Sequence, residues 1–109
     1  MSAIASITDA DFAKESSSGP VIIDFWAPWC QPCKQISKEL ESLATSYPHV
    51  RIVKINIDEH PLTARSLNIT SIPTIVFFPK SGAPLGVVGM TTAKVMTSKF
   101  RLDELVTTR

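Results

Sequence analysis

Two cysteines, Cys30 and Cys33, stand in the segment Cys-Gln-Pro-Cys, and the chain of 109 residues contains no others. Cysteines at this spacing can form a redox-active disulfide, bind a metal or attach a haem. A purely structural disulfide between them would close a very short loop, and short loops constrain the unfolded chain least. We therefore expect the pair to carry out chemistry rather than to hold the fold together.

The surrounding sequence argues against the metal-based interpretations. A zinc site needs about four ligands, and the two histidines, His49 and His60, are too far apart in sequence for the usual ligand spacing. Haem attachment needs a histidine directly after the second cysteine, where Lys34 stands. Zinc binding and a structural disulfide remain alternatives to the redox interpretation.

A helix predicted after the cysteines gives a physical reason for redox activity. Apolar residues repeat at helical spacing at Ile36, Leu40, Leu43, Ala44 and Tyr47, and Pro48 ends the pattern. Pro32 fits the first position of this helix, where its missing N–H costs nothing. Cys30 would then cap the helix, whose unpaired N–H groups and positive dipole end favour a thiolate. Thiolate is the attacking species in thiol–disulfide exchange, and Cys33 lies one turn further on.

Strands and helices alternate along the chain. The apolar run at 21–26 is typical of a strand buried on both faces. Further strands are expected at 3–7, 51–57, 75–78 and 85–88, and further helices at 10–15, 61–67 and 92–106. Asn68 is suited to end the helix at 61–67 in the left-handed conformation. This order predicts one α/β domain over residues 1–109, with a mixed sheet of four to five strands and helices on both faces.

Composition and charge restrict the class of protein. The chain is 44% hydrophobic, which suffices for a packed core at this length. Its net charge of +1 gives no sign of nucleic acid or an anionic membrane as a partner. No apolar stretch approaches the roughly 20 residues of a membrane span, and no basic and apolar leader is seen at the N-terminus. We expect a monomeric, cytoplasmic protein.

Asp24 interrupts the apolar run Val21–Trp26. A buried carboxylate without a partner is costly, so burial raises its pKa and keeps it neutral. A carboxyl group that titrates near neutral pH can relay a proton to or from Cys33. The alternative, which periodicity alone favours, is a strand residue whose oxygens reach solvent or pair with a lysine.

Several motifs together resemble the thioredoxin family. The segment 24–34, Asp-Phe-Trp-Ala-Pro-Trp-Cys-Gln-Pro-Cys-Lys, resembles the active-site segment of that family. Ile72-Pro73-Thr74 resembles its cis-proline motif, the segment 54–58 its third strand, and Val88-Gly89 the pair before its last helix. The motifs occur in family order over nearly the whole chain, so the resemblance implies a thioredoxin fold.

The resemblance assigns roles around the cysteines. It implies that Cys30 is the nucleophile and Cys33 the resolving thiol. Asp24 is implied to lie buried behind Cys33, with Lys54 nearby. Gln31, which stands where the family usually has glycine, is expected to touch the partner and to shift the reduction potential.

The resemblance also implies where a substrate docks. Pro73 is expected to be cis and to face the disulfide, with Ile72 and Thr74 offering backbone contacts to an extended substrate. A flat apolar docking surface is implied, formed by Trp29, Ile72, Pro73, Gly89 and Met90. Pro32, between the cysteines, is placed among the substrate-binding residues as well.

The implied function is that of a protein disulfide reductase that works through a mixed disulfide. The resemblance implies no bound cofactor, disulfide-containing proteins as clients, and recharging by a thioredoxin reductase with electrons from NADPH. Two alternatives stay open. One is an oxidase or isomerase of the same fold with a less stable disulfide, and the other is a binding module that uses the fold as a scaffold.

The chain departs from the family pattern at several places. Lys38 stands where a kinking proline is common, so a straighter helix is expected. Asn68 and Ser71 stand where glycines are common. About six extra residues lie between Gly89 and the segment that resembles the terminal helix. They form either a loop inserted over 90–98 or the start of a longer helix, and we expect the longer helix, over 92–106.

Overall fold

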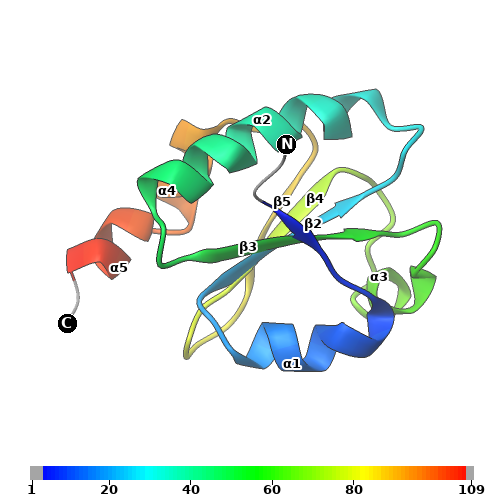
Figure 1. Ribbon diagram of the computed structural model, residues 1–109, viewed down its shortest axis with the longest axis horizontal. Coiled ribbons are helices and arrows are strands. Elements are labelled where there is room, and N and C mark those ends of the chain that lie inside the picture. Colours follow the sequence, from blue (N-terminus) through cyan, green and yellow to red (C-terminus); the bar gives the residue numbers. More distant parts are fainter. Residues whose placement is uncertain (1–3, 108–109) are drawn as a thin grey trace.

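The apolar run Val21–Trp26 forms the central strand of a five-stranded sheet in the computed structural model, which describes residues 4–107 (Figure 1). The elements in chain order are β1 (Ala5–Ser6), a 3₁₀ turn (Asp9–Asp11), α1 (Phe12–Ser17), β2 (Val21–Trp26), α2 (Gln31–Ser46), β3 (Arg51–Asn56), α3 (Pro61–Ser66), β4 (Thr74–Phe78), β5 (Leu85–Val88), α4 (Ala93–Lys99) and α5 (Leu102–Thr107). This confirms the predicted thioredoxin fold with a mixed sheet.

The sheet has the strand order β1-β3-β2-β4-β5. The strands β1, β3 and β2 run parallel, and β4 and β5 run antiparallel to their neighbours. The ends of β2 and β3 therefore meet the start of β4 and the end of β5 at one edge of the sheet. That edge carries the loop with the two cysteines.

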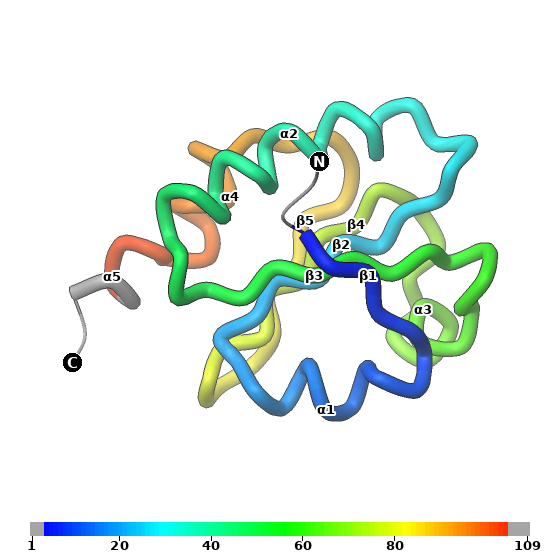
Figure 2. The backbone as a smooth tube through the Cα atoms, viewed as in Figure 1, coloured from blue at the N-terminus to red at the C-terminus, as the bar shows by residue number. Residues whose placement is uncertain are grey.

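Helices cover both faces of the sheet, with α2 and α4 on one side and α1 and α3 on the other (Figures 1 and 2). Side chains of β2 alternate between the two cores, as strand geometry requires. Ile22 packs in the core beneath α2 with Ile36, Leu40 and other buried residues. Val21, Ile23 and Phe25 pack in the opposite core.

Element bounds differ from the predictions in detail. Of the strand expected at 3–7, only Ala5–Ser6 is paired, and Ala3 lies outside the described residues. Pro32 is the second residue of α2 rather than its first. Helix α2 continues through Lys38 to Ser46. Asn68 has a φ of 58°, which confirms its predicted left-handed conformation after α3.

The single helix predicted over 92–106 is wrong, because the chain breaks it at Phe100 and Arg101. Arg101 takes a left-handed φ of 56°. Phe100 and Leu102 are both buried, and Phe100 stacks on Phe77 with ring centroids 5.3 Å apart. In one continuous helix, residues two positions apart, such as 100 and 102, would point about 200° apart around the helix axis. The break lets both side chains enter the same core.

Candidate active site

Cys30 and Cys33 form a disulfide at the N-terminus of α2, with Cα atoms 5.3 Å apart. Cys30 is the N-cap residue, and the N–H of Cys33 donates to its Sγ at 3.2 Å. The sulfur thus takes the place of the side-chain oxygen that usually caps a helix. Both cysteines are buried, with exposed fractions of 4% and 2%. The helix N-terminus therefore directs N–H groups and a positive dipole at Cys30, as the sequence predicted.

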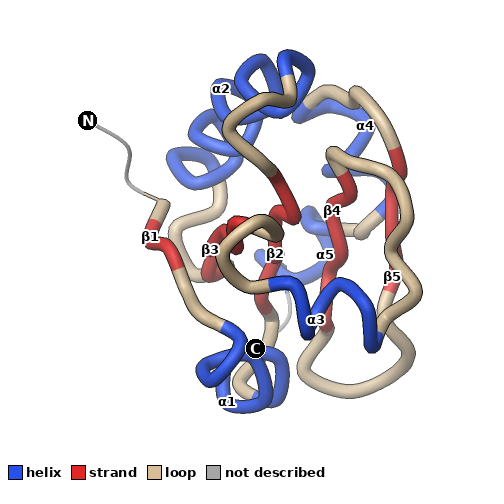
Figure 3. The backbone as a smooth tube through the Cα atoms, turned by 90° about the vertical axis from the view of Figure 1, so that its right-hand side faces the viewer, coloured by secondary structure: helices blue, strands red, loops and turns tan. Residues whose placement is uncertain are grey.

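Strand register brings the proline motif to the same edge of the sheet. Thr74 pairs with Phe25 of β2, so Pro73 lies beside the end of β2 that leads into the cysteine loop. The Ile72–Pro73 peptide bond is cis, which confirms that expectation. Figure 3 looks onto this edge and shows the loop between β2 and α2 above α3.

Gly89 follows β5 at the same edge. Its N–H donates to the carbonyl of Pro73 at 2.8 Å. Its φ of 91° lies in the region that glycine adopts without strain. The chain therefore turns away from β5 here and leads into Met90, whose side chain is half exposed. Pro73 and Thr74 are buried.

Trp29 is the most prominent exposed aromatic side chain near the disulfide, with 67% of its surface exposed. Its Nε1 donates to Oδ2 of Asp58 at 3.0 Å. Gln31 and Pro32, between the cysteines, are exposed as well. Apolar side chains exposed together at one edge are typical of a binding surface.

Asp58 is a site residue that the sequence analysis missed. It lies just after β3, and its backbone N–H donates to Oδ1 of Asn56 at 2.9 Å. The sequence placed it in the strand-like segment 54–58, but it gave no sign of a contact with Trp29. The two residues are 29 positions apart and meet only because β2 and β3 end side by side.

Asp24 lies within the core beneath α2. Only 1% of the surface of Asp24 is exposed, and its Oδ1 has no hydrogen-bond partner among the described residues. Burial raises the pKa of Asp24 from 3.8 to about 7, and the charge of Lys54 opposes this rise. The alternative of an exposed or lysine-paired carboxylate is therefore wrong.

Lys54 is the register partner of Asp24 on β3. Its Nζ lies 5.2 Å from the centroid of the Trp26 ring, within the range of a cation–π contact. Nε1 of Trp26 is buried and has no hydrogen-bond partner in the described part of the chain. The carboxyl, the ammonium and the indole thus gather on the face of the sheet that α2 covers.

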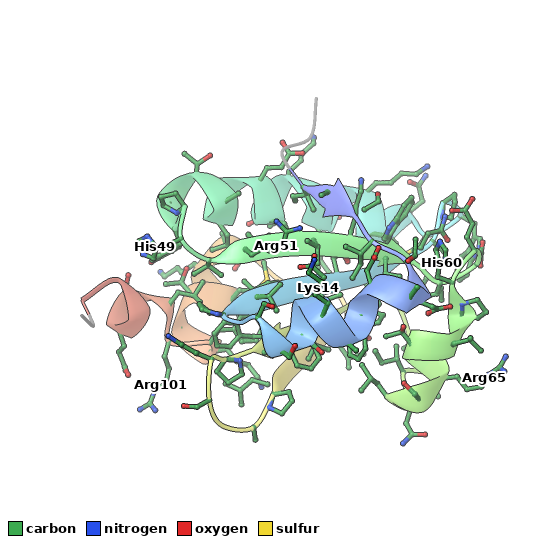
Figure 4. All side chains as sticks on the ribbon, turned by 60° about the horizontal axis from the view of Figure 1, so that its bottom comes forward. Lys14, His49, Arg51, His60, Arg65 and Arg101 are labelled. Atoms are coloured by element: carbon green, nitrogen blue, oxygen red, sulfur yellow. A yellow bond between two sulfur atoms is a disulfide. The ribbon has the colours of Figure 1, made fainter. Side chains whose placement is uncertain are left out.

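Residues 4–107 contain neither a cluster of metal-binding side chains nor a membrane-spanning helix. Among residues 4–107, no three His, Cys, Asp or Glu side chains gather closely enough to hold a metal ion. Figure 4 shows His49 and His60 at opposite ends of the molecule, which removes the ligand set of the zinc alternative. No described helix has the length and apolar character needed to cross a membrane.

Comparison with known proteins is consistent with this geometry. A family model described as Thioredoxin matches residues 3–101. A thioredoxin from Staphylococcus aureus (strain Mu50 / ATCC 700699) is 46% identical over 84 residues, which cover 76% of this chain and 80% of that protein.

Solved structures of two thioredoxins have a similar fold. The crystal structure of chloroplastic thioredoxin z has a TM-score of 0.82 at 31% identity and covers 93% of this chain and 95% of its own. Mitochondrial thioredoxin 3 from Saccharomyces cerevisiae, in its oxidized form, has a TM-score of 0.79 at 31% identity, with coverage of 90% and 94%.

Proposed function

Because the chain belongs to the thioredoxin family and is a thiol–disulfide oxidoreductase, we propose that it acts as a general protein disulfide reductase. The observation that carries this proposal is the Cys30–Cys33 pair at the N-cap of α2. We take residues 1–109 as a single thioredoxin domain. The chain itself supplies the two electrons from its dithiol form.

The first step is attack by the Cys30 thiolate on a client disulfide. A bond forms between Cys30 Sγ and one client sulfur, the client S–S bond breaks, and the other client sulfur leaves as a thiolate. The N–H of Cys33, which donates to Cys30 Sγ in the disulfide form, supports the thiolate in the reduced form.

The second step releases the client. Cys33 loses its proton to the Asp24 carboxylate and attacks Cys30 Sγ, which forms the Cys30–Cys33 disulfide and frees the second client sulfur as a thiolate. A pKa of about 7 supports this role for Asp24, since both of its protonation states are populated near neutral pH. Lys54 limits the rise of that pKa and acts as a positioning residue.

The client is proposed to lie across the docking surface of Trp29, Ile72, Pro73, Gly89 and Met90. The backbones of Ile72 and Thr74 contact an extended client segment, and Gln31 and Pro32 meet it between the cysteines. The exposure of Trp29 and Met90 supports this placement. Recognition through backbone and apolar contacts suits a reductase with many clients, because it reads little client sequence.

Recharging requires an external reductant. We propose that a thioredoxin reductase returns two electrons from NADPH to the Cys30–Cys33 disulfide and that both partners work in the cytoplasm. The protein is proposed to act as a monomer and to bind no cofactor, no nucleic acid and no membrane.

A coupled assay tests the proposal. The purified protein, NADPH, a thioredoxin reductase and a disulfide-containing model protein are combined, and NADPH consumption is followed. We expect turnover that disappears in the Cys30→Ser, Cys33→Ser variant. Absence of turnover with the wild-type chain would contradict the reductase role.

An oxidase or isomerase is the second candidate. The hydrogen bond from the N–H of Cys33 to Cys30 Sγ favours it, because a stabilised thiolate makes the disulfide easier to reduce. The midpoint potential distinguishes the two functions. A potential far more oxidising than cytosolic glutathione would favour the oxidase, and full biological activity of the variant without cysteines would favour a scaffold role.

A further inference from the structure

A pocket of about 360 Å³ lies on the face of β4 and β5 that points away from α2. Its floor is made by Thr74, Val76 and Phe78 of β4 and by Gly86 and Val88 of β5, and its wall by the segment 67–71. None of its lining side chains is charged. The volume lies near the lower end of the roughly 300–1,000 Å³ that ligand pockets occupy.

The pocket exists because β4 and the outermost strand, β5, are incompletely covered on this face. Helix α3 is only six residues long and ends at Ser66, so it does not extend over β5. Figure 3 shows β5 at the outer side of the sheet. Gly86, opposite Val76, has no side chain to fill the space, although a Cβ there would meet only Val76 Cγ2 at 4.0 Å and Ile75 O at 3.8 Å.

The pocket is continuous with the docking surface. Thr74 and Val88 pair with each other in the sheet, and they directly adjoin Pro73 and Gly89 of the docking surface. At a rise of about 3.3 Å per residue, three residues along β5 lead from Gly89 to Gly86, a distance of roughly 10 Å. A client segment whose cysteine lies beside Gly89 and whose next residues extend along β5 reaches Gly86 within about three residues.

The edge of β5 offers backbone groups to such a segment. The bond from Gly89 N–H to Pro73 O faces β4. Because antiparallel strands direct alternate residues inward and outward, the N–H and C=O groups of Val88 and Gly86 point away from β4. In the described sheet β5 is an outermost strand, so an added client strand can pair with these groups.

We propose that this pocket binds a bulky apolar side chain of the client, about three residues from the client's disulfide cysteine. The chain thereby prefers client segments with an aromatic or branched aliphatic residue at that distance. Val88, which is 67% exposed, supplies apolar surface to the floor of the pocket. This inference rests on the proposed reductase function.

Peptide disulfides test the inference. Each probe is a peptide dimer joined through one cysteine, with Phe three residues before or three residues after that cysteine, and a matched peptide has Ser in the same place. We expect kcat/KM to be about tenfold higher for Phe than for Ser at one of the two positions, as apolar pockets discriminate by this order.

Two variants locate the preference. Gly86→Val fills the pocket from its floor, and Val88→Ser removes apolar surface at an exposed position, so each should reduce the Phe-to-Ser ratio to below twofold. Ala83→Val, an exposed change outside the pocket lining, is the matched control and should keep the ratio.

The outcomes separate the two proposals. Suppose that the protein reduces the disulfides of both the Phe and the Ser peptides with equal kcat/KM. That result would overturn the pocket inference, while the reductase function would stand. The same holds if both variants keep the wild-type ratio. Failure to reduce any peptide or model protein disulfide would overturn the reductase function, and the pocket inference would be lost with it.

Discussion

Asp24 and Lys54 are direct register partners on β2 and β3, yet in the described structure no ion pair joins them. The Lys54 ammonium lies against the Trp26 ring instead, 5.2 Å from its centroid. The carboxyl of Asp24 is left buried without a partner for its Oδ1. The lysine charge therefore lowers the cost of an ionised Asp24 without removing it, and this sets a pKa near neutrality.

Asp24→Asn should make protein stability less dependent on pH. Burial raises the pKa of Asp24 from 3.8 to about 7. Between pH 3.8 and about pH 7, Asp24 is therefore protonated in the folded state but ionised in the unfolded state. Wild-type stability therefore falls as the pH rises from about 4 to about 7 and changes little through this group above that. At 1.36 kcal/mol per pH unit, the loss is about 4 kcal/mol.

Urea unfolding of the oxidised protein at pH 4 and pH 8 measures this effect. The free energy of unfolding of Asp24→Asn minus that of wild type should be about 4 kcal/mol larger at pH 8 than at pH 4, so the variant gains relative stability as the pH rises. A relative stability that stays constant between the two pH values would show that Asp24 ionises in the folded protein as readily as in the unfolded chain.

Lys54→Met should raise the pKa of Asp24 above about 7. The methionine keeps an apolar stem against Trp26 but removes the charge that favours the carboxylate. Carbon-13 NMR of the Asp24 carboxyl against pH gives the midpoint directly. Lys34→Met, which changes an exposed lysine on α2, is the control and should leave the titration midpoint of Asp24 unchanged. An unchanged midpoint in Lys54→Met would exclude Lys54 as the source of the effect.

Much of the fold was predictable from local pattern. The run Val21–Trp26 is apolar except for Asp24 and became β2, and the periodic apolar stripe that Pro48 ends became α2. Both signals depend on the spacing of the apolar residues that a strand or helix must bury, and this spacing can be read from the sequence. The cysteine pair and its place at the helix cap follow from the same pattern.

The features that local sequence pattern alone did not predict depend on long-range packing. The burial of Asp24 requires α2 to cover its face of β2, which periodicity within one strand does not reveal. The break at Arg101 follows from the common core that Phe100 and Leu102 enter. The contact between Trp29 and Asp58 requires the ends of two strands to be adjacent.

Cys33→Ser should trap a mixed disulfide on Cys30. Burial does not distinguish the two sulfurs, but Cys30 Sγ accepts the N–H of Cys33 at the helix cap and is the better stabilised thiolate. Without a resolving thiol, the client remains attached. Mass spectrometry after incubation with a disulfide client identifies the adduct. Cys30→Ser should yield little adduct, and an adduct on Cys33 in preference would reverse the assignment.

Asp9→Ala should destabilise the fold by about 1 kcal/mol at pH 7, the usual cost of losing a helix cap. Oδ1 of Asp9 accepts from the N–H and hydroxyl of Thr63, and Oδ2 accepts from the N–H of Leu62, at the start of α3. Partial burial acts to raise the pKa of Asp9, but these hydrogen bonds outweigh it and lower the pKa from 3.8.

The sign of the pH dependence follows from that lowered pKa. The contribution of Asp9 is present above about pH 4 and is lost as the pH falls through its folded-state value. Urea unfolding at pH 7 and pH 3 should therefore show a smaller difference between Asp9→Ala and wild type at pH 3. Glu59→Ala, another acidic change near α3, is the control and should have little effect at pH 7. An equal loss for both variants would attribute the effect to net charge.

Asp58→Ala should weaken client binding by freeing Trp29. The bond from Trp29 Nε1 to Asp58 Oδ2 orients a ring that is otherwise largely exposed. A hydrogen bond of this kind contributes about 1 kcal/mol, so we expect KM for a disulfide client to rise by about fivefold with kcat little changed. Asp58→Asn keeps an oxygen acceptor and should stay close to wild type.

A second measurement separates orientation of Trp29 from a general structural effect. The indole N–H resonance of Trp29 should move upfield and exchange faster with solvent in Asp58→Ala, while the Trp26 resonance, from a buried indole, should not change. If KM rises equally in Asp58→Ala and Asp58→Asn, the loss comes from the charge of Asp58 at the docking surface. The hydrogen bond to Trp29 would then have no part in client binding.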